Sequence, residues 1–320
     1  MLFQAALIAT GVWSVLAPCY ALEGETRAPG PGRLAVYWGS ESGSTTLDDV
    51  CSDSSYNIVN LAFLNYFFSA GGYPATSIGD LGGPSTAQRD AGATGLQDGS
   101  SLISAMKACQ SAGKLLFLSL GGANSYADVT LDSDAQGEQM ADTLWNLFLG
   151  GDSALRPFGD VKLDGIDLDN ESSDHTGYLA MIRRLRSHYS SDSSKAYYLS
   201  AAPRCSFREA SQWLDVYRQA DLVWVQFYGC GQSSVAQRSF AEAVANWAGG
   251  IGGAQLFIGA LASGDDDAGD TAGYVDANTL VASVQSVKGM GLGNYGGVML
   301  WDAQLAVDNG NYQKQIAGSV

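Results

Sequence analysis

The chain has 320 residues, of which 46% are hydrophobic and 16% are charged, so it carries enough apolar surface for a large core. Its 17 Lys and Arg stand against 33 Asp and Glu, a formal charge of −16, which excludes binding to nucleic acid or to an anionic membrane surface. Only two histidines occur, His175 and His188, which disfavours a His-rich metal site and a Ser-His-Asp triad. What remains is a soluble acidic protein, an enzyme or a binder of neutral ligands.

The N-terminal segment has the pattern of a secretory leader. Residues 1–22 contain no Lys, Arg, Asp or Glu, and residues 5–16 form an apolar run too short to span a bilayer. Cys19 and Ala21 place small residues at the −3 and −1 positions of a cleavage point. We therefore expect a signal peptide at 1–21, a short linker at 22–32, a single catalytic domain at 33–320 and a secreted protein. A buried N-terminal helix is the alternative.

Removal of that leader also removes Cys19 and leaves four cysteines, Cys51, Cys109, Cys205 and Cys230. An even number in an exported chain favours disulfides over buried free thiols. Four thiols allow three connectivities, and their spacing alone does not choose among them.

Short apolar runs with β character recur along the chain at intervals too long for hairpins. They fall at 34–38, 58–64, 115–120, 161–168, 197–201, 222–228, 256–261 and 298–301. Between them, segments such as 102–109, 140–148 and 179–185 carry apolar residues at helical spacing. Eight apolar strands alternating with amphipathic helices predict an α/β fold, a (β/α)8 TIM barrel in one domain. A doubly wound open sheet is the alternative.

The fourth predicted strand continues into a row of acidic residues. Asp164, Asp167, Asp169 and Glu171 follow one another at steps of three, two and two, around the apolar Ile166 and Leu168. Because alternate residues of a strand share a face, Asp167, Asp169 and Glu171 are predicted to point into the barrel.

Crowded, buried carboxyl groups suit acid catalysis. Burial and like charge raise the proton affinity of one member of such a row, so it stays protonated as a general acid. A divalent metal site is one alternative, but no histidine joins the row and all three side chains come from one strand. A solvated acidic edge is the other, and the alternating Ile166 and Leu168 argue against it. We expect no metal and no cofactor.

Residues 164–171 match the DGxDxDxE motif, and the chain resembles glycoside hydrolase family eighteen, specifically its plant-type (class III) chitinases. In the motif Asp164 and Gly165 are the structural residues. Supporting segments occur in family order at 35–39, 60–65, 118–122, 147–151, 201–203, 223–228 and 297–301.

The resemblance implies retaining, substrate-assisted cleavage of β-1,4-linked N-acetylglucosamine. Glu171 would protonate the leaving oxygen while the substrate's acetamido oxygen attacks C1 to give an oxazolinium ion. Asp169 would orient the acetamido N–H, and Asp167 would share a proton with Asp169. Tyr228 would hold the acetamido oxygen, and Gln226 would line the same pocket.

Aromatic residues supply the sugar platform that the resemblance implies. Trp301 would form the floor of the −1 subsite with Tyr37 and Phe63 beside it, although core packing is the alternative for each. The resemblance also implies cis peptide bonds at Ala62–Phe63 and Trp301–Asp302. It pairs Cys51 with Cys109 and Cys205 with Cys230. The family's third bridge has no counterpart, and residues 69–99 form a longer loop that we expect to reshape the groove.

Three further features carry secondary expectations. Asn170, which begins the sequon Asn170-Glu171-Ser172, should face the helix layer and stay unmodified. The GxGxxG pattern at 291–296 precedes a predicted strand, so it does not fit dinucleotide binding. The aspartates at 265–267 and 270 lack calcium-loop spacing, and we expect a solvated loop.

The predicted function is a secreted, monomeric endochitinase acting on chitin or N-acetylglucosamine oligosaccharides, without nucleic-acid or membrane partners. Two alternatives remain. One is an endo-β-N-acetylglucosaminidase acting on glycoprotein glycans. The other is a catalytically silent lectin or inhibitor, and such family members typically lose the Glu or the adjacent Asp that this chain keeps as Glu171 and Asp169.

Overall fold

The computed structural model describes residues 30, 32–41, 43–79, 81–123, 127–264 and 273–320. The expected signal peptide at 1–21, most of the expected linker and the aspartates at 265–267 and 270 lie outside the described residues. Within the described ranges no helix is long and apolar enough to cross a membrane.

Eight parallel strands close into a barrel, which confirms the predicted fold. They run in the order β1-β9-β8-β7-β6-β5-β4-β2, and pairing of β1 with β2 closes the ring. The strands are β1 (Arg33–Trp38), β2 (Ile58–Tyr66), β4 (Leu115–Gly122), β5 (Gly165–Asn170), β6 (Tyr198–Ala201), β7 (Leu222–Gln226), β8 (Gln255–Leu261) and β9 (Tyr295–Trp301). A ninth, short strand, β3 (Ala75–Thr76), pairs antiparallel with β2 outside the ring.

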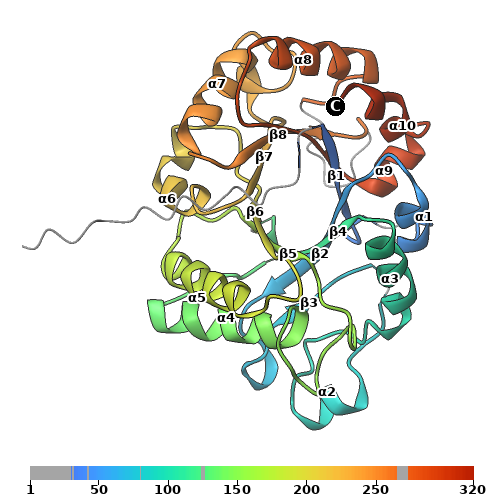
Figure 1. Ribbon diagram of the computed structural model, residues 1–320, viewed down its shortest axis with the longest axis vertical. Coiled ribbons are helices and arrows are strands. Elements are labelled where there is room, and N and C mark those ends of the chain that lie inside the picture. The colour runs from blue at the N-terminus through green and yellow to red at the C-terminus, as the bar shows by residue number, and fades with distance from the viewer. Residues whose placement is uncertain (1–29, 31, 42, 80, 124–126, 265–272) are drawn as a thin grey trace, which may run out of the picture.

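Helices surround the strands in an outer ring, as the view in Figure 1 shows. They are α1 (Leu47–Ser52), α3 (Ile103–Ser111), α4 (Asp134–Phe148), α5 (Tyr178–Ser191), α6 (Leu214–Tyr217), α7 (Phe240–Gly250), α8 (Ala277–Gly289), α9 (Ala303–Asp308) and α10 (Tyr312–Ile316). Side-chain oxygens cap the N-termini of several of these helices. Ser133 accepts a hydrogen bond from the Gln136 N–H at α4, and Asp276 accepts one from the Thr279 N–H at α8.

The alternation of side chains along each strand produces two apolar layers. One layer lies between the strands and the helices and includes Ile166 and Leu168 of β5. The other fills the barrel and contains large aromatic side chains, among them Phe117, Trp224 and Phe257. The polar side chain of Asp167 is fully buried on the inner side of β5, which confirms the prediction that this face of the strand points into the barrel.

Several strand boundaries were predicted wrongly, most clearly those of β5 and β7. Residues 161–164 precede β5 instead of belonging to it. Val161 and Leu163 are buried in the irregular segment between α4 and β5, where the Leu163 N–H donates to the Phe148 carbonyl. At the other end Glu171 lies just beyond β5. Strand β7 ends at Gln226, so Tyr228 lies two residues past the strand.

The cysteine pairing implied by the resemblance is confirmed. Cys51–Cys109 joins α1 to α3, and Cys205–Cys230 joins the segments after β6 and β7. The peptide bonds Ala62–Phe63 and Trp301–Asp302 are both cis, as expected.

The described part of the 69–99 segment folds outside the ring of helices. It contains β3 and the short helix α2 (Thr86–Asp90), which begins with a capping box between Ser85 and Gln88. In Figure 1 α2 projects away from the barrel between α3 and α4. Ser77, Gly79 and Leu81 of this segment line a cavity of about 500 Å³ together with Trp38 and Gly39 at the end of β1.

Candidate active site

The three inward carboxylates Asp167, Asp169 and Glu171, called here the carboxylate row, climb from the barrel interior to the mouth at the C-terminal ends of the strands. Asp167 is 0% exposed and Asp169 4% exposed, whereas the Glu171 side chain is 18% exposed. The row therefore runs from a dry environment to a partly solvated one. In a barrel of this kind the chemistry belongs at this end.

Asp167 is held by four donors from four other strands. Tyr37 Oη and Ser119 Oγ donate to its Oδ2 at 2.8 and 2.6 Å. Ser200 Oγ and Trp224 Nε1 donate to its Oδ1 at 2.7 and 3.0 Å. Burial raises the pKa of Asp167, while these hydrogen bonds act in the opposite direction.

Asp169 has a much weaker donor set. Gln226 Nε2 donates to its Oδ1 at 3.0 Å. The pKa of Asp169 is raised well above its ordinary value, first by burial and then by the charges of Glu171 and Asp167. Because the four donors around Asp167 favour its ionised form, a proton held within this pair belongs on Asp169.

Glu171 lies at the mouth between two polar side chains. Gln226 Nε2 is 3.5 Å from its Oε1, and Arg204 Nη1 is 3.6 Å from its Oε2. The same Gln226 amide also donates to the Ala202 carbonyl at 3.0 Å. Gln226 thus bridges the two outer carboxylates and is fixed to the backbone after β6.

Three aromatic rings form one wall above the row. The Trp301 ring centroid lies 5.4 Å from that of Tyr37 and 6.0 Å from that of Phe63, with only 21° between the Phe63 and Trp301 planes. Trp301 is half-buried, whereas Tyr37 is 1% exposed. Tyr37 borders the mouth and also packs in the barrel core, the two roles that the sequence left open. Its hydroxyl supports Asp167, which the sequence did not indicate.

These side chains enclose a cavity of about 230 Å³, called here the mouth cavity. Its walls are Tyr37, Phe63, Ala123, Asp169, Glu171, Arg204, Gln226, Tyr228, Leu261 and Trp301. The structure therefore brings together every predicted catalytic and substrate-binding residue except Asp167, which lies directly beneath. A pyranose ring offers C–H faces for the aromatic wall and polar groups for the carboxylates.

The two remaining motif residues lie at the opposite end of β5 and are structural. Asp164 Oδ2 accepts hydrogen bonds from the Leu116 N–H and from Gln110 Nε2, both at 2.9 Å, and its Oδ1 pairs with Lys195 Nζ at 2.9 Å. A Cβ on Gly165 would lie 2.4 Å from the Tyr198 carbonyl oxygen, so no larger residue fits there.

Asn170 faces the helix layer, as predicted from its parity. Its Nδ2 donates to Tyr178 Oη at 2.8 Å, and its Oδ1 accepts from the Ser172 N–H at 2.8 Å. Both ends of the amide are therefore used inside the fold, and an unmodified Asn170 stays a prediction.

Sequence reasoning missed several partners of the row. Ser119, Ser200 and Trp224 support Asp167, and Arg204 borders Glu171. Trp224 was detectable, because it lies two residues before Gln226 and so shares its inward face. The two serines and Arg204 carried no such signal.

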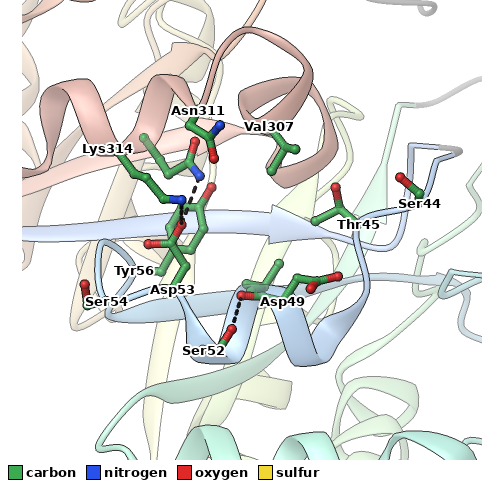
Figure 2. A pocket seen from close by; sticks show the side chains of 12 residues that line it. Ser44, Thr45, Asp49, Ser52, Asp53, Ser54, Tyr56, Val307, Asn311 and Lys314 are labelled. Carbon is green, nitrogen blue, oxygen red and sulfur yellow. Dashed lines mark hydrogen bonds and ion pairs between the residues drawn. The ribbon is translucent and has the colours of Figure 1, made fainter.

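A larger cavity of about 600 Å³ lies on the outer side of the barrel between α1 and the C-terminal helices. Figure 2 shows its polar side chains, among them Asp53, Asn311 and Lys314. None of the carboxylate row or its aromatic wall lines it. We therefore assign the chemistry to the smaller mouth cavity.

Asp302, next to Trp301, gives stability an unusual dependence on pH. Its buried carboxylate caps α9 by accepting from the Leu305 N–H at 3.0 Å, and burial raises its pKa from 3.8 to about 7. Between these values the folded chain holds a proton that the unfolded chain has released, so stability falls as pH rises.

We expect Asp302→Asn to remove this loss, because Asn caps a helix as well as Asp does and carries no charge. The parent should lose up to about 1.4 kcal/mol of unfolding free energy per pH unit relative to the variant. Urea unfolding of both proteins at pH of about 4, 5.5 and 7 measures the difference. Parallel pH curves for the two proteins would contradict the assignment.

The sequence profile of the family described as Glycosyl hydrolases family 18 matches residues 33–255. The chain is 57% identical over 323 residues to Endochitinase 3 of Metarhizium robertsii, with 100% of both chains covered.

Among solved structures, the ICChI chitinase from Ipomoea carnea superposes with a TM-score of 0.77 at 29% identity, covering 90% of this chain and 100% of that one. The xylanase and α-amylase inhibitor protein XAIP-II from Scadoxus multiflorus superposes with a TM-score of 0.74 at 27% identity, covering 91% and 100%. The same architecture therefore occurs in proteins named as enzymes and as inhibitors.

Proposed function

The chain belongs to the glycosyl hydrolases of family 18, and on that basis we propose that it is a secreted endochitinase that cleaves β-1,4-linked N-acetylglucosamine with retention of configuration. One observation carries the proposal: the carboxylate row rises from a fully buried Asp167 to a half-buried Glu171 beneath an aromatic wall. The relationship to Endochitinase 3 over the whole chain supports the same substrate class.

Glu171 is the general acid of the proposed reaction. The acetamido oxygen of the substrate attacks C1, the bond from C1 to the glycosidic oxygen breaks, and that oxygen takes the proton of Glu171. An oxazolinium ion remains. A water molecule then attacks C1, and Glu171 takes a proton from this water. The oxazolinium ring opens, which regenerates the acetamido group.

Asp169 and Tyr228 orient the acetamido group on the other side of the mouth cavity. Asp169 accepts a hydrogen bond from the acetamido N–H, and its negative charge stabilises the oxazolinium ion. The Asp169 carboxylate becomes available as an acceptor because Asp169 shares its proton with Asp167. Tyr228 holds the acetamido oxygen near C1, which lowers the entropic cost of the attack.

Charge and shape favour a neutral polysaccharide. A formal charge of −16 repels an anionic bacterial wall but not chitin, which is neutral or slightly cationic where deacetylated. The cavity lined by Trp38 of β1 with Ser77, Gly79 and Leu81 and the mouth cavity both lie at the C-terminal ends of the strands, which suits a chain-like substrate. Residues 1–21 are proposed as the leader that exports the protein, which acts as a monomer.

An inhibitor or lectin is the second candidate, because XAIP-II shares the architecture. The presence of both Asp169 and Glu171 favours an enzyme. An endo-β-N-acetylglucosaminidase, with the same row and a different substrate, is the third candidate.

Release of reducing ends from chitotetraose and release of glycans from a high-mannose glycoprotein, measured side by side, separate these functions. We expect turnover of chitotetraose and none of the glycoprotein. Turnover of the glycoprotein alone would establish the glycosidase alternative, and tight oligosaccharide binding without turnover would establish the lectin.

A further inference from the structure

A second, smaller cavity lies behind Glu171, on the side away from the aromatic wall. This side cavity has a volume of about 160 Å³ and shares Glu171 and Arg204 with the mouth cavity. Its other walls include Ser173, Gln212 and Trp213. Glu171 and Arg204 therefore form a partition with one cavity on each face.

The backbone of Arg204 is fixed in place. Arg204 makes a parallel β-bridge with Gln226, and the Gln226 N–H donates to the Pro203 carbonyl at 2.9 Å. The next residue, Cys205, is tied to Cys230 by a disulfide. The guanidinium group therefore starts from a defined position beside the acid.

The side chain itself is available for a ligand. It is 56% exposed, and its 3.6 Å separation from Glu171 is an ion pair longer than a hydrogen bond. Within the part of the chain that the structure describes, the guanidinium group makes no hydrogen bond. A planar group with five N–H donors therefore lines both cavities.

Trp213, which also lines the side cavity, is held in place by its neighbours. Trp213 is 3% exposed, and its Nε1 donates to the Ser172 carbonyl at 3.2 Å, directly after Glu171. Its ring packs edge-on against Tyr178 with centroids 4.9 Å apart. The segment that carries the acid is therefore held against a rigid indole.

From this arrangement we propose that the side cavity receives the leaving sugar and that Arg204 is the residue that selects for it. This inference rests on the proposed function, because the oxygen protonated by Glu171 joins two sugars, and Glu171 and Arg204 line both the mouth cavity and the side cavity. With one sugar on the aromatic wall, the other lies against Arg204. The guanidinium donates hydrogen bonds to the hydroxyl or acetamido oxygens of that leaving sugar.

The test uses two substrates that differ in the leaving group. Chitotetraose leaves a sugar, whereas the 4-methylumbelliferyl glycoside of chitobiose leaves a flat aromatic alcohol without hydroxyl or acetamido partners. We expect Arg204→Ala to lower kcat/KM for chitotetraose by about 10-fold or more, the value of a charged hydrogen bond. The value for the aryl glycoside should stay within about 2-fold of the parent.

Two variants complete the design. Arg208→Ala removes an exposed arginine four residues away that lines neither cavity, and it should leave kcat/KM for both substrates unchanged. Arg204→Gln keeps an amide donor and should restore part of the chitotetraose activity. A role in folding alone would instead lower both activities together, and thermal melting of each variant reports it directly.

Equal losses on the two substrates, or no loss on chitotetraose, would overturn the inference while leaving the proposed function intact. A parent that turned over neither substrate would overturn the proposed function. In that case calorimetry decides the inference, since equal chitotetraose affinities of the parent and of Arg204→Ala would also overturn it.

Discussion

Replacement of Glu171 by Gln is expected to lower kcat for chitotetraose by about 10²- to 10⁴-fold, the usual contribution of a positioned general acid. Gln matches the shape of Glu but has no proton to give to the leaving oxygen. The contact to Gln226 at 3.5 Å lies at the edge of hydrogen-bond range, so replacing the Glu171 carboxylate by an amide should disturb the mouth cavity little. Oligosaccharide affinity, measured by calorimetry, should therefore be retained.

Glu242→Gln is the matched control for this substitution. Glu242 is exposed on the outer helix α7 and borders neither the mouth cavity nor the side cavity. Its kcat should equal that of the parent. Turnover by Glu171→Gln at the rate of the parent would remove Glu171 from the role of acid.

Replacement of Asp169 by Asn is expected to lower kcat by about 10²- to 10³-fold, the effect of deleting one preorganised group that stabilises a transition-state charge. The Asn oxygen still accepts the hydrogen bond from Gln226, so the side chain keeps its place. It loses the charge that faces the oxazolinium ion. Initial rates on chitotetraose measure the effect.

Asp90→Asn, an exposed position on α2, makes the same chemical change away from the site and should leave kcat unaltered. A kcat for Asp169→Asn within about 3-fold of the parent would show that the reaction does not depend on the charge of Asp169. It would also separate the role of Asp169 from that of Glu171.

The central part of the site could be predicted because it follows from one strand. The two-residue period of a strand placed Asp167, Asp169 and Glu171 on one face, and the structure has them there. The resemblance to family eighteen added Tyr228, Gln226 and the aromatic wall.

The support of the row could not be predicted, because it depends on register between strands far apart in the sequence. Ser119 of β4 and Ser200 of β6 meet Asp167 since each is its register partner on a neighbouring strand. A single serine in an apolar strand gives no sign of which partner it will face. The position of Arg204 beside Glu171 could not be predicted for the same reason, since it follows from the β-bridge to Gln226.

Strand ends and the long loop were the weakest part of the prediction. Hydrophobicity alone does not separate residues 161–163, which lie in the irregular segment between α4 and β5, from the strand that follows them. Residues 69–99 are rich in Gly, Asp and Ser, and their path depends on side-chain contacts such as the hydrogen bond from Gln88 Nε2 to the Leu155 carbonyl at 3.2 Å.

The configuration of the first products tests the proposed mechanism most directly. Chitotetraose hydrolysis followed by proton NMR, before mutarotation sets in, reports whether the new reducing end is the α or the β anomer. Attack by the acetamido oxygen above the carboxylate row, followed by attack of water, inverts C1 twice, so the proposed mechanism predicts β products. Initial α products would contradict it.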